Sequence, residues 1–345
     1  MVQKVRYNVR QNDMISNTNS SSMSKCAACG KGGDNLKVCS SCERVSYCNA
    51  KCRNAHRSKH KKECRQYTAE IRDKNAAIRA DFDAISEKLS EIEISDEELF
   101  ADPPPKADCP ICMLPIPYAL GMHQVETTYQ PCCGKTLCNG CLNESYEEMD
   151  KGNLKDWCAF CRQPNPNSLE ELMERVKKRI AMGDAEAFHW LGGQYYDGNG
   201  YFSQDYNRAF TLWNKAADLG SVRTHNALAL AYDSGDVVER DVKRAFHHYK
   251  IAAIGGHEYA RYYLGVFEYD NGDIDRSIKH YMMAARNGFD ESLREVGGAY
   301  KAGHITKDQY LATLCAYQDS QAEMRSEQRT KAYMRARKQK KGSRR

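Results

Sequence analysis

The chain has 345 residues, 28% of them charged, and a formal net charge of +5 at pH 7. This composition is typical of a soluble protein with two or three domains. No run approaches the roughly 18 apolar residues that a membrane-spanning helix needs, and residues 1–24 are polar, without the apolar core of a secretory signal. We therefore expect an intracellular protein, cytoplasmic or nuclear, with residues 1–24 disordered.

Sixteen cysteines dominate the chemistry, and fifteen of them fall into two dense clusters. Pairs two residues apart are typical of zinc ligands, because one turn of backbone presents both sulfurs to one metal. A disulfide framework is the alternative, but it belongs to exported proteins. We therefore predict zinc in both clusters. The leftover Cys315 lies in an apolar helical context, which indicates a buried structural thiol.

The first cluster, residues 25–64, offers enough ligands for two zinc ions with four each. They are Cys26, Cys29, Cys39, Cys42, Cys48, Cys52, His60 and Cys64. Their spacing, the Tyr47-Cys48 pair and the ending His-Lys-Lys-Glu-Cys resemble a MYND-type zinc finger. The resemblance implies interleaved sites, with Cys26, Cys29, Cys48 and Cys52 on one ion and Cys39, Cys42, His60 and Cys64 on the other. Spacing alone also permits two sequential sites.

Three features of this finger keep alternatives open. His56 is four residues from both Cys52 and His60, so it is a rival ligand. The resemblance implies a protein-interaction module that often recognises short proline-containing peptides, but Arg57 replaces the family's usual tryptophan. Eleven Lys and Arg residues between residues 25 and 65 would suit nucleic acid. No interleaved aromatic platform accompanies them, so a solvated basic face is the favoured interpretation.

Residues 65–107 are predicted to form a helical connector. Apolar residues recur along it at helical spacing, with charges on the opposite face, at Ala69, Ile78, Phe82, Ile85, Leu89 and Ile92. Residues 95–98 and three prolines at 103–105 end the helix and begin an extended entry into the next cluster. We expect the apolar stripe to pack on a zinc module or on another chain, for example in a coiled-coil dimer.

The second cluster, residues 108–163, places eight cysteines in pairs: Cys109 and Cys112, Cys132 and Cys133, Cys138 and Cys141, Cys158 and Cys161. It resembles a RING finger, which implies a cross-brace with Cys109, Cys112, Cys138 and Cys141 on one zinc and Cys132, Cys133, Cys158 and Cys161 on the other. Lys135 stands where the family has a histidine if Cys133 is the third ligand. Either Cys132 and Cys133 both ligate, as the count of eight cysteines favours, or one does and His123 completes the site.

RING-type ubiquitin ligases bind a ubiquitin-conjugating enzyme through an apolar residue between the first two ligands, an apolar patch near the last pair and a cation after the last ligand. The matching positions are Ile111, Trp157 or Phe160, and Arg162. Such a ligase acts by holding the thioester between ubiquitin and the conjugating enzyme in a reactive orientation. It supplies no nucleophile or general base, so no catalytic residue is expected in this chain. The competing interpretation makes Ile111 and Phe160 the core of a small domain.

A repeat begins after Asn167. The same helical pattern occurs three times, with matching residue types at matching spacing. Its positions are Asp205, Ala209, Ala216, Ala217 and Gly220, then Asp241, Ala245, Ala252, Ala253 and Gly256, then Asp273, Ser277, Ala284, Ala285 and Gly288. The aspartate caps the helix, the alanines allow close approach, and the glycine accepts a left-handed turn. The partner helices carry Leu191, Leu228, Leu264 and Val296. The pattern resembles Sel-like repeats, relatives of tetratricopeptide repeats, which implies a protein-binding α-solenoid over residues 168–317.

Residues 318–345 are predicted to continue the last solenoid helix into a disordered basic tail. From Arg325 onwards there are ten Lys or Arg residues and one acid, Glu327. Such a tail suits a nuclear-import signal or a weak contact with RNA or DNA. A frayed, solvated end explains it equally.

The predicted fold is therefore a pair of small zinc-stabilised α+β modules, MYND-like and RING-like, followed by an all-α solenoid of helix-pair repeats. Each module is expected to hold two zinc ions. Three functions follow. In the first, the protein is a RING-type ubiquitin ligase whose solenoid and MYND-like finger recruit a protein substrate. In the second, it is a non-enzymatic scaffold that binds protein partners, and weak nucleic-acid binding through the tail is a third.

Overall fold

The computed structural model describes residues 26–31, 37–38, 46–66, 69, 94–118, 127–152, 156–198, 202–235 and 238–342. The chain divides into two compact units, residues 1–87 and 88–345. The predictions for residues 1–24, for most of the connector, and for Cys39, Cys42 and His123 lie outside the described residues. In the part that is described, no helix has both the length and the apolar character needed to cross a membrane.

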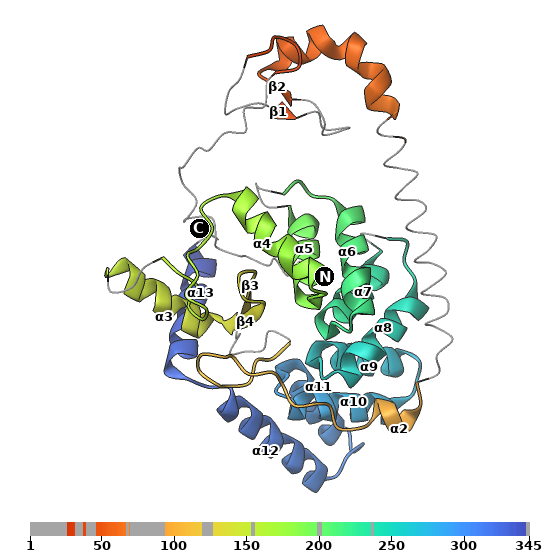
Figure 1. Ribbon diagram of the computed structural model, residues 1–345. Coiled ribbons are helices and arrows are strands. Elements are labelled where there is room, and N and C mark those ends of the chain that lie inside the picture. Colours follow the sequence, from red (N-terminus) through yellow and green to blue (C-terminus); the bar gives the residue numbers. More distant parts are fainter. Residues whose placement is uncertain are drawn as a thin grey trace. The chain divides into compact units, whose positions relative to one another are not determined.

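The first unit combines a short hairpin with a helix (Figure 1). Strand β1 (Lys37–Val38) pairs antiparallel with β2 (Ser46–Tyr47), and residues 50–66 are helical. The Tyr47 residue is 2% exposed, and its hydroxyl lies 3.1 Å from His56 Nδ1. The buried His60 ring stacks on that of His56, with 6.0 Å between the ring centroids. These aromatic contacts join the hairpin to the helix.

The second unit begins with residues 94–118, here called the strap. Ser95 caps the short helix α2 (Asp96–Leu99) by accepting a hydrogen bond from the Glu98 backbone at 3.2 Å. A segment without regular secondary structure then runs through the three prolines towards Cys109. The strap is orange in Figure 1 and lies against the solenoid. Thus the described end of the connector packs on the repeats, whereas the predicted apolar stripe, apart from Ala69, lies outside the described residues.

Several contacts fasten the strap to the solenoid. Leu99 is fully buried in the same apolar cluster as Leu228 and Leu264. Arg261 donates a hydrogen bond to the Leu99 carbonyl, and Arg276 pairs with Asp96. Further along, the Lys106 ammonium pairs with Glu258 at 3.2 Å, and it donates to the Asn287 carbonyl at 2.7 Å. Apolar burial and charge therefore act together along the whole strap.

The second cysteine cluster folds as a small α+β module. Strands β3 (Thr127–Gln130) and β4 (Lys135–Cys138) form an antiparallel hairpin in which Gln130 pairs with Lys135. Helix α3 (Asn139–Asp150) follows β4 directly. Leu137 and Cys138 are fully buried, so the end of β4 lies in the interior of the module.

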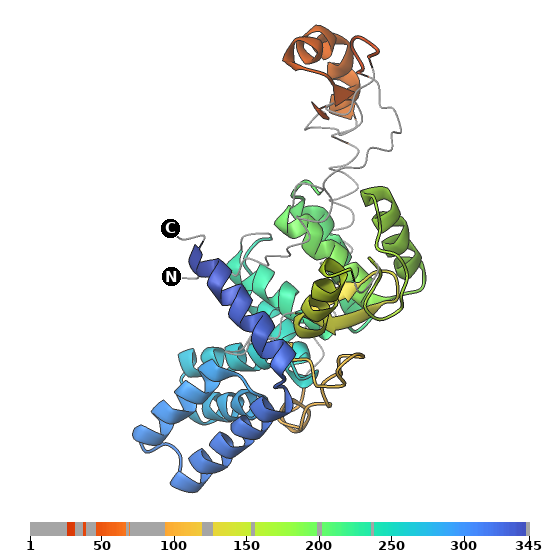
Figure 2. The ribbon, with the colours of Figure 1, turned by 90° about the vertical axis from the view of Figure 1, so that its left-hand side faces the viewer.

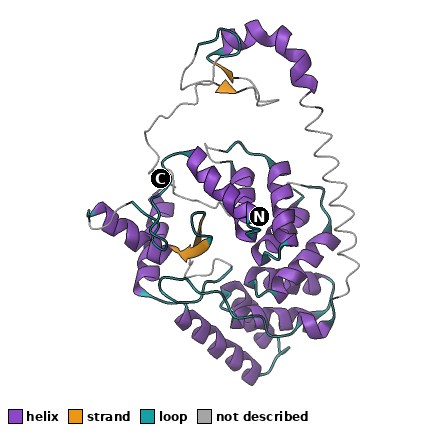
Figure 3. Ribbon diagram, in the orientation of Figure 1, coloured by secondary structure: helices purple, strands orange, loops and turns teal. Residues whose placement is uncertain are grey.

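Helices fill nearly all of the chain from residue 169 onwards (Figure 3). The predicted caps are confirmed: Asp205, Asp241 and Asp273 each accept a hydrogen bond at 3.0 Å from the backbone three residues later. The glycines Gly220, Gly256 and Gly288 have φ values of +84°, +90° and +94°, which only glycine adopts without strain. The helices are α4 (Leu169–Ala181), α5 (Ala185–Asp197), α6 (Tyr206–Asp218), α7 (Val222–Ser234), α8 (Val242–Ile254), α9 (Glu258–Asp270), α10 (Ile274–Arg286), α11 (Asp290–Lys301) and α12 (Lys307–Glu323).

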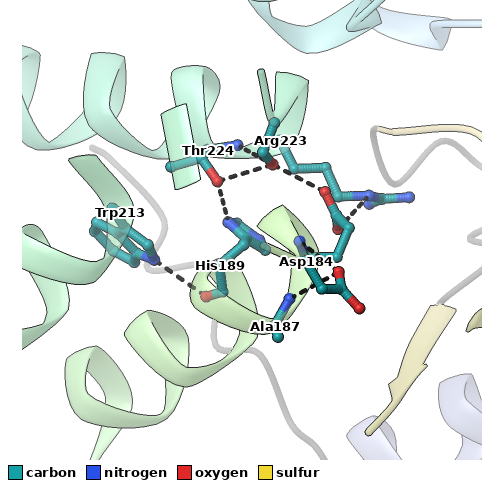
Figure 4. A network of polar contacts seen from close by, with 8 residues as sticks. Asp184, Ala187, His189, Trp213, Arg223 and Thr224 are labelled. Carbon is teal, nitrogen blue, oxygen red and sulfur yellow. Dashed lines mark hydrogen bonds and ion pairs between the residues drawn. The ribbon is translucent and has the colours of Figure 1, made fainter. Parts of the chain in front are cut away.

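The solenoid core contains apolar clusters and buried polar networks. The predicted core positions Leu191, Leu228, Leu264 and Val296 are all buried. Figure 4 shows one network between α5 and α7, where His189 Nδ1 lies 3.0 Å from the Thr224 hydroxyl. The Thr224 hydroxyl donates to Ser221, and Ser221 donates to Glu186 at 2.8 Å. Such hydrogen bonds satisfy the polar atoms that close packing of the repeats buries.

One prediction about the C-terminal region is wrong. Cys315 is exposed on α12, because the buried position of that turn is taken by Thr313. The last solenoid helix continues past residue 317 to Glu323, and after a short break a new helix, α13 (Glu327–Gly342), follows. Figure 2 shows α12 and α13 in blue, meeting at an angle. Helix α13 packs against α3 of the cysteine module.

Buried histidines should make the solenoid sensitive to acid. Burial lowers the pKa of His225 to about 4 and that of His280 to about 3. The nearby Arg261 and Arg276 guanidiniums lower the His280 pKa further, against the opposing effect of Asp96. Below the unfolded pKa of about 6.5, the unfolded chain therefore binds protons that the folded chain does not. We predict that the free energy of unfolding falls by about 1.4 kcal/mol per pH unit for each such histidine as the pH drops below 6.5.

Urea unfolding at pH 6.5 and pH 5 measures this slope. His280→Leu should reduce it, whereas the same change at the exposed His304 should not. The cysteine sites also titrate and contribute to the pH dependence of unfolding. Their contribution is the same in each variant, so it cancels when the slopes of the variants are compared. Equal slopes in His280→Leu and the unmodified chain would contradict the prediction.

Candidate metal centres

Cysteine sulfurs gather at three places in the described residues. In each group, the four sulfur atoms lie within 4.8 Å of one another. The groups, here called tetrads, are Cys26, Cys29, Cys48 and Cys52 (tetrad 1), Cys109, Cys112, Cys138 and Cys141 (tetrad 2), and Cys132, Cys133, Cys158 and Cys161 (tetrad 3). These are the groupings that the two resemblances imply. All cysteines in the described residues are free thiols, so none of them forms the alternative disulfide framework.

Tetrad 1 joins a turn, the end of the hairpin and the start of the helix. The turn that carries Cys26 and Cys29 is closed by a bond of 2.8 Å from the Gly30 backbone N–H to the Cys26 carbonyl. Cys48 directly follows β2, and Cys52 lies in the first turn of the helix. The sulfur of Cys48 is 3.7 Å from that of Cys29 and 3.2 Å from that of Cys52. The first and third cysteine pairs of the finger therefore meet, as the interleaved arrangement requires, and the second pair lies between them in the sequence.

Tetrads 2 and 3 are linked by the β3–β4 hairpin. Cys132 and Cys133 lie in its turn, whereas Cys138 ends β4 and belongs to tetrad 2. Sulfur separations are 4.0 Å for Cys109 and Cys141, and 3.8 Å for Cys112 and Cys138. In tetrad 3, the Cys161 and Cys132 sulfurs are 3.5 Å apart. The edge of a tetrahedron with zinc–sulfur bonds of about 2.3 Å is about 3.8 Å, so both tetrads have the size that zinc requires.

The pKa values of the cysteine thiols are also consistent with a bound cation. Hydrogen bonding from Cys138 lowers the pKa of Cys109 to about 4, and hydrogen bonds from Cys132 and Cys133 lower the pKa of Cys158. Burial raises the pKa of Cys141 to about 12. One thiolate therefore forms readily in each tetrad of the module, whereas thiols such as Cys141 resist ionisation. A divalent cation at the centre removes that resistance, because it compensates the charge of several thiolates at once.

The remaining predicted ligands are only partly described. His60 is buried and Cys64 half-buried on the helix of the first unit, and their predicted partners Cys39 and Cys42 lie outside the described residues. His56, the rival ligand, faces the Tyr47 hydroxyl. In the second cluster, Cys132 and Cys133 both join tetrad 3, which favours the first of the two alternatives over a site completed by His123. Lys135 is exposed on β4.

The apolar residues predicted to contact a conjugating enzyme lie on the surface of the module. Ile111, Trp157 and Phe160 are 40%, 36% and 40% exposed. The buried cluster around tetrad 2 contains Ile116 instead. The interpretation of Ile111 and Phe160 as ordinary core is therefore wrong. Arg162 is also exposed, and its φ of +61° places it in the left-handed turn after the last cysteine.

Three contacts to the module were not predictable from the cysteine spacing. The Tyr129 hydroxyl on β3 donates to Asp184, the N-cap of α5, at 2.7 Å. Arg179 on α4 donates to the Cys132 carbonyl at 3.2 Å. At the other end of the solenoid, Arg329 on α13 reaches the Cys112 sulfur. The module is thus bound both to the first helices of the repeat region and to the helix that follows its last one.

Family models match two parts of the chain. A MYND finger model matches residues 26–64, and a Sel1 repeat model matches residues 185–221, 223–257 and 258–289. The chain contains a MYND finger and Sel1 repeats. Both matches lie outside residues 108–163, so the resemblance of that module to a RING finger stays a prediction.

Two solved structures are similar to part of the chain. One is c5321, a protective antigen present in uropathogenic Escherichia coli strains and displaying an SLR fold, with 30% identity over 44% of this chain and 33% of that chain and a TM-score of 0.38. The chain thus spans about a third of the length of that antigen. The other is a Sel1 repeat protein from Oxalobacter formigenes, with 27% identity over 38% of this chain and 99% of that chain and a TM-score of 0.35. A comparison with the curated proteins finds no significant match.

If tetrad 2 holds zinc, a single ligand change should release one ion. We predict that Cys109→Ser lowers the zinc count in native mass spectrometry by one and lowers the thermal midpoint of the second unit, because a small module depends on its metal for folding. Cys315→Ser is the matched control, since Cys315 is exposed and outside the tetrads. An unchanged zinc count in Cys109→Ser would exclude tetrad 2 as a zinc site.

Proposed function

We propose that this protein is a zinc-dependent scaffold that binds other proteins through its Sel1 repeats and its MYND finger. The observation that carries the proposal is the presence of both interaction modules in one chain, at residues 26–64 and 185–289. A helix-pair solenoid presents an extended surface that suits protein ligands. The second cysteine module adds exposed apolar side chains of its own.

The role of the metal in this proposal is structural. Tetrad 1, with the neighbouring site formed by Cys39, Cys42, His60 and Cys64, would hold two zinc ions in the MYND finger. Tetrads 2 and 3 would hold two more. A closed tetrahedral site with four cysteines leaves no position for substrate. Zinc would supply folding energy here, and the chain's own surface residues would supply recognition.

Peptide binding tests the scaffold proposal. The MYND finger is expected to bind a member of a library of short proline-containing peptides, with a fluorescence anisotropy change that saturates at micromolar peptide. Cys48→Ser, which removes a tetrad 1 ligand, should weaken that binding at least about tenfold, because the finger loses its folding energy. Cys315→Ser should bind as the unmodified chain does. If no peptide of the library saturates, or if Cys48→Ser binds equally well, the finger does not recognise such peptides.

Ligase activity is a second candidate function, favoured by one specific observation. The residues that the RING resemblance assigns to a conjugating enzyme, Ile111, Trp157 and Phe160, are large, apolar and exposed on one small module. Arg162 is exposed close to them in the sequence, after the last cysteine. Exposed apolar side chains rimmed by polar residues mark protein-binding sites. A conjugating enzyme would be held there, and its thioester would react through orientation alone.

An autoubiquitination assay separates the two functions. If the module recruits a charged conjugating enzyme, the unmodified chain forms ubiquitin conjugates, and Ile111→Ala and Arg162→Ala each reduce their rate about tenfold or more with zinc fully bound, because the thioester is no longer held in its reactive orientation. Met182→Ala serves as control, because Met182 is 74% exposed but lies outside the module. Absence of conjugates across a panel of conjugating enzymes would leave the scaffold as the function.

A further inference from the structure

Arg329 is a deeply buried cation on the C-terminal helix α13. Only 4% of the residue is exposed. Its Nη1 donates to the Pro115 carbonyl at 2.8 Å and to the Met324 carbonyl at 2.9 Å. Its Nη2 donates to the Leu114 carbonyl at 3.0 Å and lies 3.4 Å from the Cys112 sulfur. The guanidinium thus reaches a tetrad 2 ligand that lies 217 residues earlier in the chain.

A buried guanidinium needs a negative partner. Arginine stays protonated in proteins, and an uncompensated charge in a protein interior costs several kcal/mol. In the described part of the chain, Arg329 makes no ion pair with a carboxylate, whereas its neighbours Lys331 and Arg335 pair with Glu327 and Glu147. The groups that face the Arg329 guanidinium are neutral carbonyls and the sulfurs of Cys112 and Cys138, both in tetrad 2. Protonated thiols would offset none of its charge, and a single thiolate would offset it only in part.

A metal-loaded tetrad 2 would provide the missing charge. Four thiolates around one divalent ion carry a net charge of about −2, so the loaded site is itself an anion. Cys109 and Cys138 of the tetrad are fully buried, which places this charge in a medium of low dielectric constant, where it attracts a neighbouring cation strongly. Hydrogen bonds to ligand atoms from outside the coordination sphere are a usual means of tuning a metal site.

The packing of α13 against α3 holds Arg329 in this place. A side chain on Gly140 would put its Cβ 2.8 Å from the Arg329 backbone nitrogen and 3.0 Å from its Cα. Only glycine therefore allows the two helices to approach this closely. The ion pair between Arg335 and Glu147 joins the same two helices, but its side chains are 51% and 39% exposed, so it contributes little.

We propose that Arg329 is the counter-ion of metal-loaded tetrad 2, so that metal binding by Cys109, Cys112, Cys138 and Cys141 and docking of α13 stabilise each other. Arg329 acts through Cys112 and is a positioning residue of the site. The inference rests on metal binding by tetrad 2, which is part of the proposed function. Because linkage is reciprocal, the factor by which α13 docking tightens the metal equals the factor by which the metal tightens α13 docking.

Cysteine alkylation during a chelator titration of the full zinc-loaded chain tests the proposal. Mass spectrometry of the alkylated peptides reports tetrads 2 and 3 separately. In Arg329→Met, tetrad 2 should become reactive at a chelator concentration about 10- to 100-fold lower, as is typical for loss of such a partner, while the tetrad 3 midpoint stays unchanged. Arg329→Lys, which retains the charge, should recover most of the difference. Arg335→Met is the matched control and should leave both midpoints unchanged.

Hydrogen exchange supplies the reciprocal measurement. Chelation should speed amide exchange in α13 of both chains, because the module loses its metal, but by a factor about 10 to 100 larger in the unmodified chain than in Arg329→Met. Gly140→Ala, which keeps the arginine but moves the helix, should weaken tetrad 2 as Arg329→Met does. An unchanged tetrad 2 midpoint in Arg329→Met, or an equal shift in Arg335→Met, overturns the proposal while metal binding stands. Alkylation of tetrad 2 in the unmodified chain without chelator overturns both.

Discussion

Repulsion between neighbouring sulfur charges is the constraint on which both small modules depend. Two unit charges about 4 Å apart repel each other by roughly 4 kcal/mol at an effective dielectric constant of about 20, and each tetrad brings four sulfurs within 4.8 Å of one another. Only a cation at the centre allows these thiols to ionise together. The modules are too small to replace this energy by apolar burial. The solenoid differs, because fully buried residues such as Leu228 and Leu264 supply its stability directly.

Much of the fold was predictable from local sequence patterns. The regular spacing of aspartate, alanine and glycine in the repeats predicts where individual helices begin and end. The structure places the helix caps and turns at those residues. The cysteine spacing reports which sulfurs a short turn can bring together, such as Cys109 with Cys112. The cross-brace, which brings Cys112 close to Cys138, is not local, and it followed only from the resemblance to a known finger.

The features that were missed or mispredicted all depend on contacts between distant segments. Nothing near Arg329 in the sequence distinguishes it from the other basic residues of a charged tail, and only the packing of α13 on α3 shows its role. The strap is a similar case, because Leu99 is buried by residues of the repeats, far along the chain. Cys315 lies beside apolar residues in the sequence, but the orientation of α12 turns it outward. Periodicity indicates that a helix has a buried side, and tertiary packing decides which side that is.

The module's attachment to both ends of the repeat region has a mechanical consequence. In an open solenoid each repeat contacts only its neighbours, so the array as a whole bends easily. Here Tyr129 and Arg179 anchor the module to α5 and α4, and α13 anchors it to the C-terminal end of the array. Because the module connects the two ends of the repeat array, it opposes the motion that would bend the array as a whole. The repeats are thus held at one curvature before any ligand arrives, which lowers the entropy lost when a rigid partner binds.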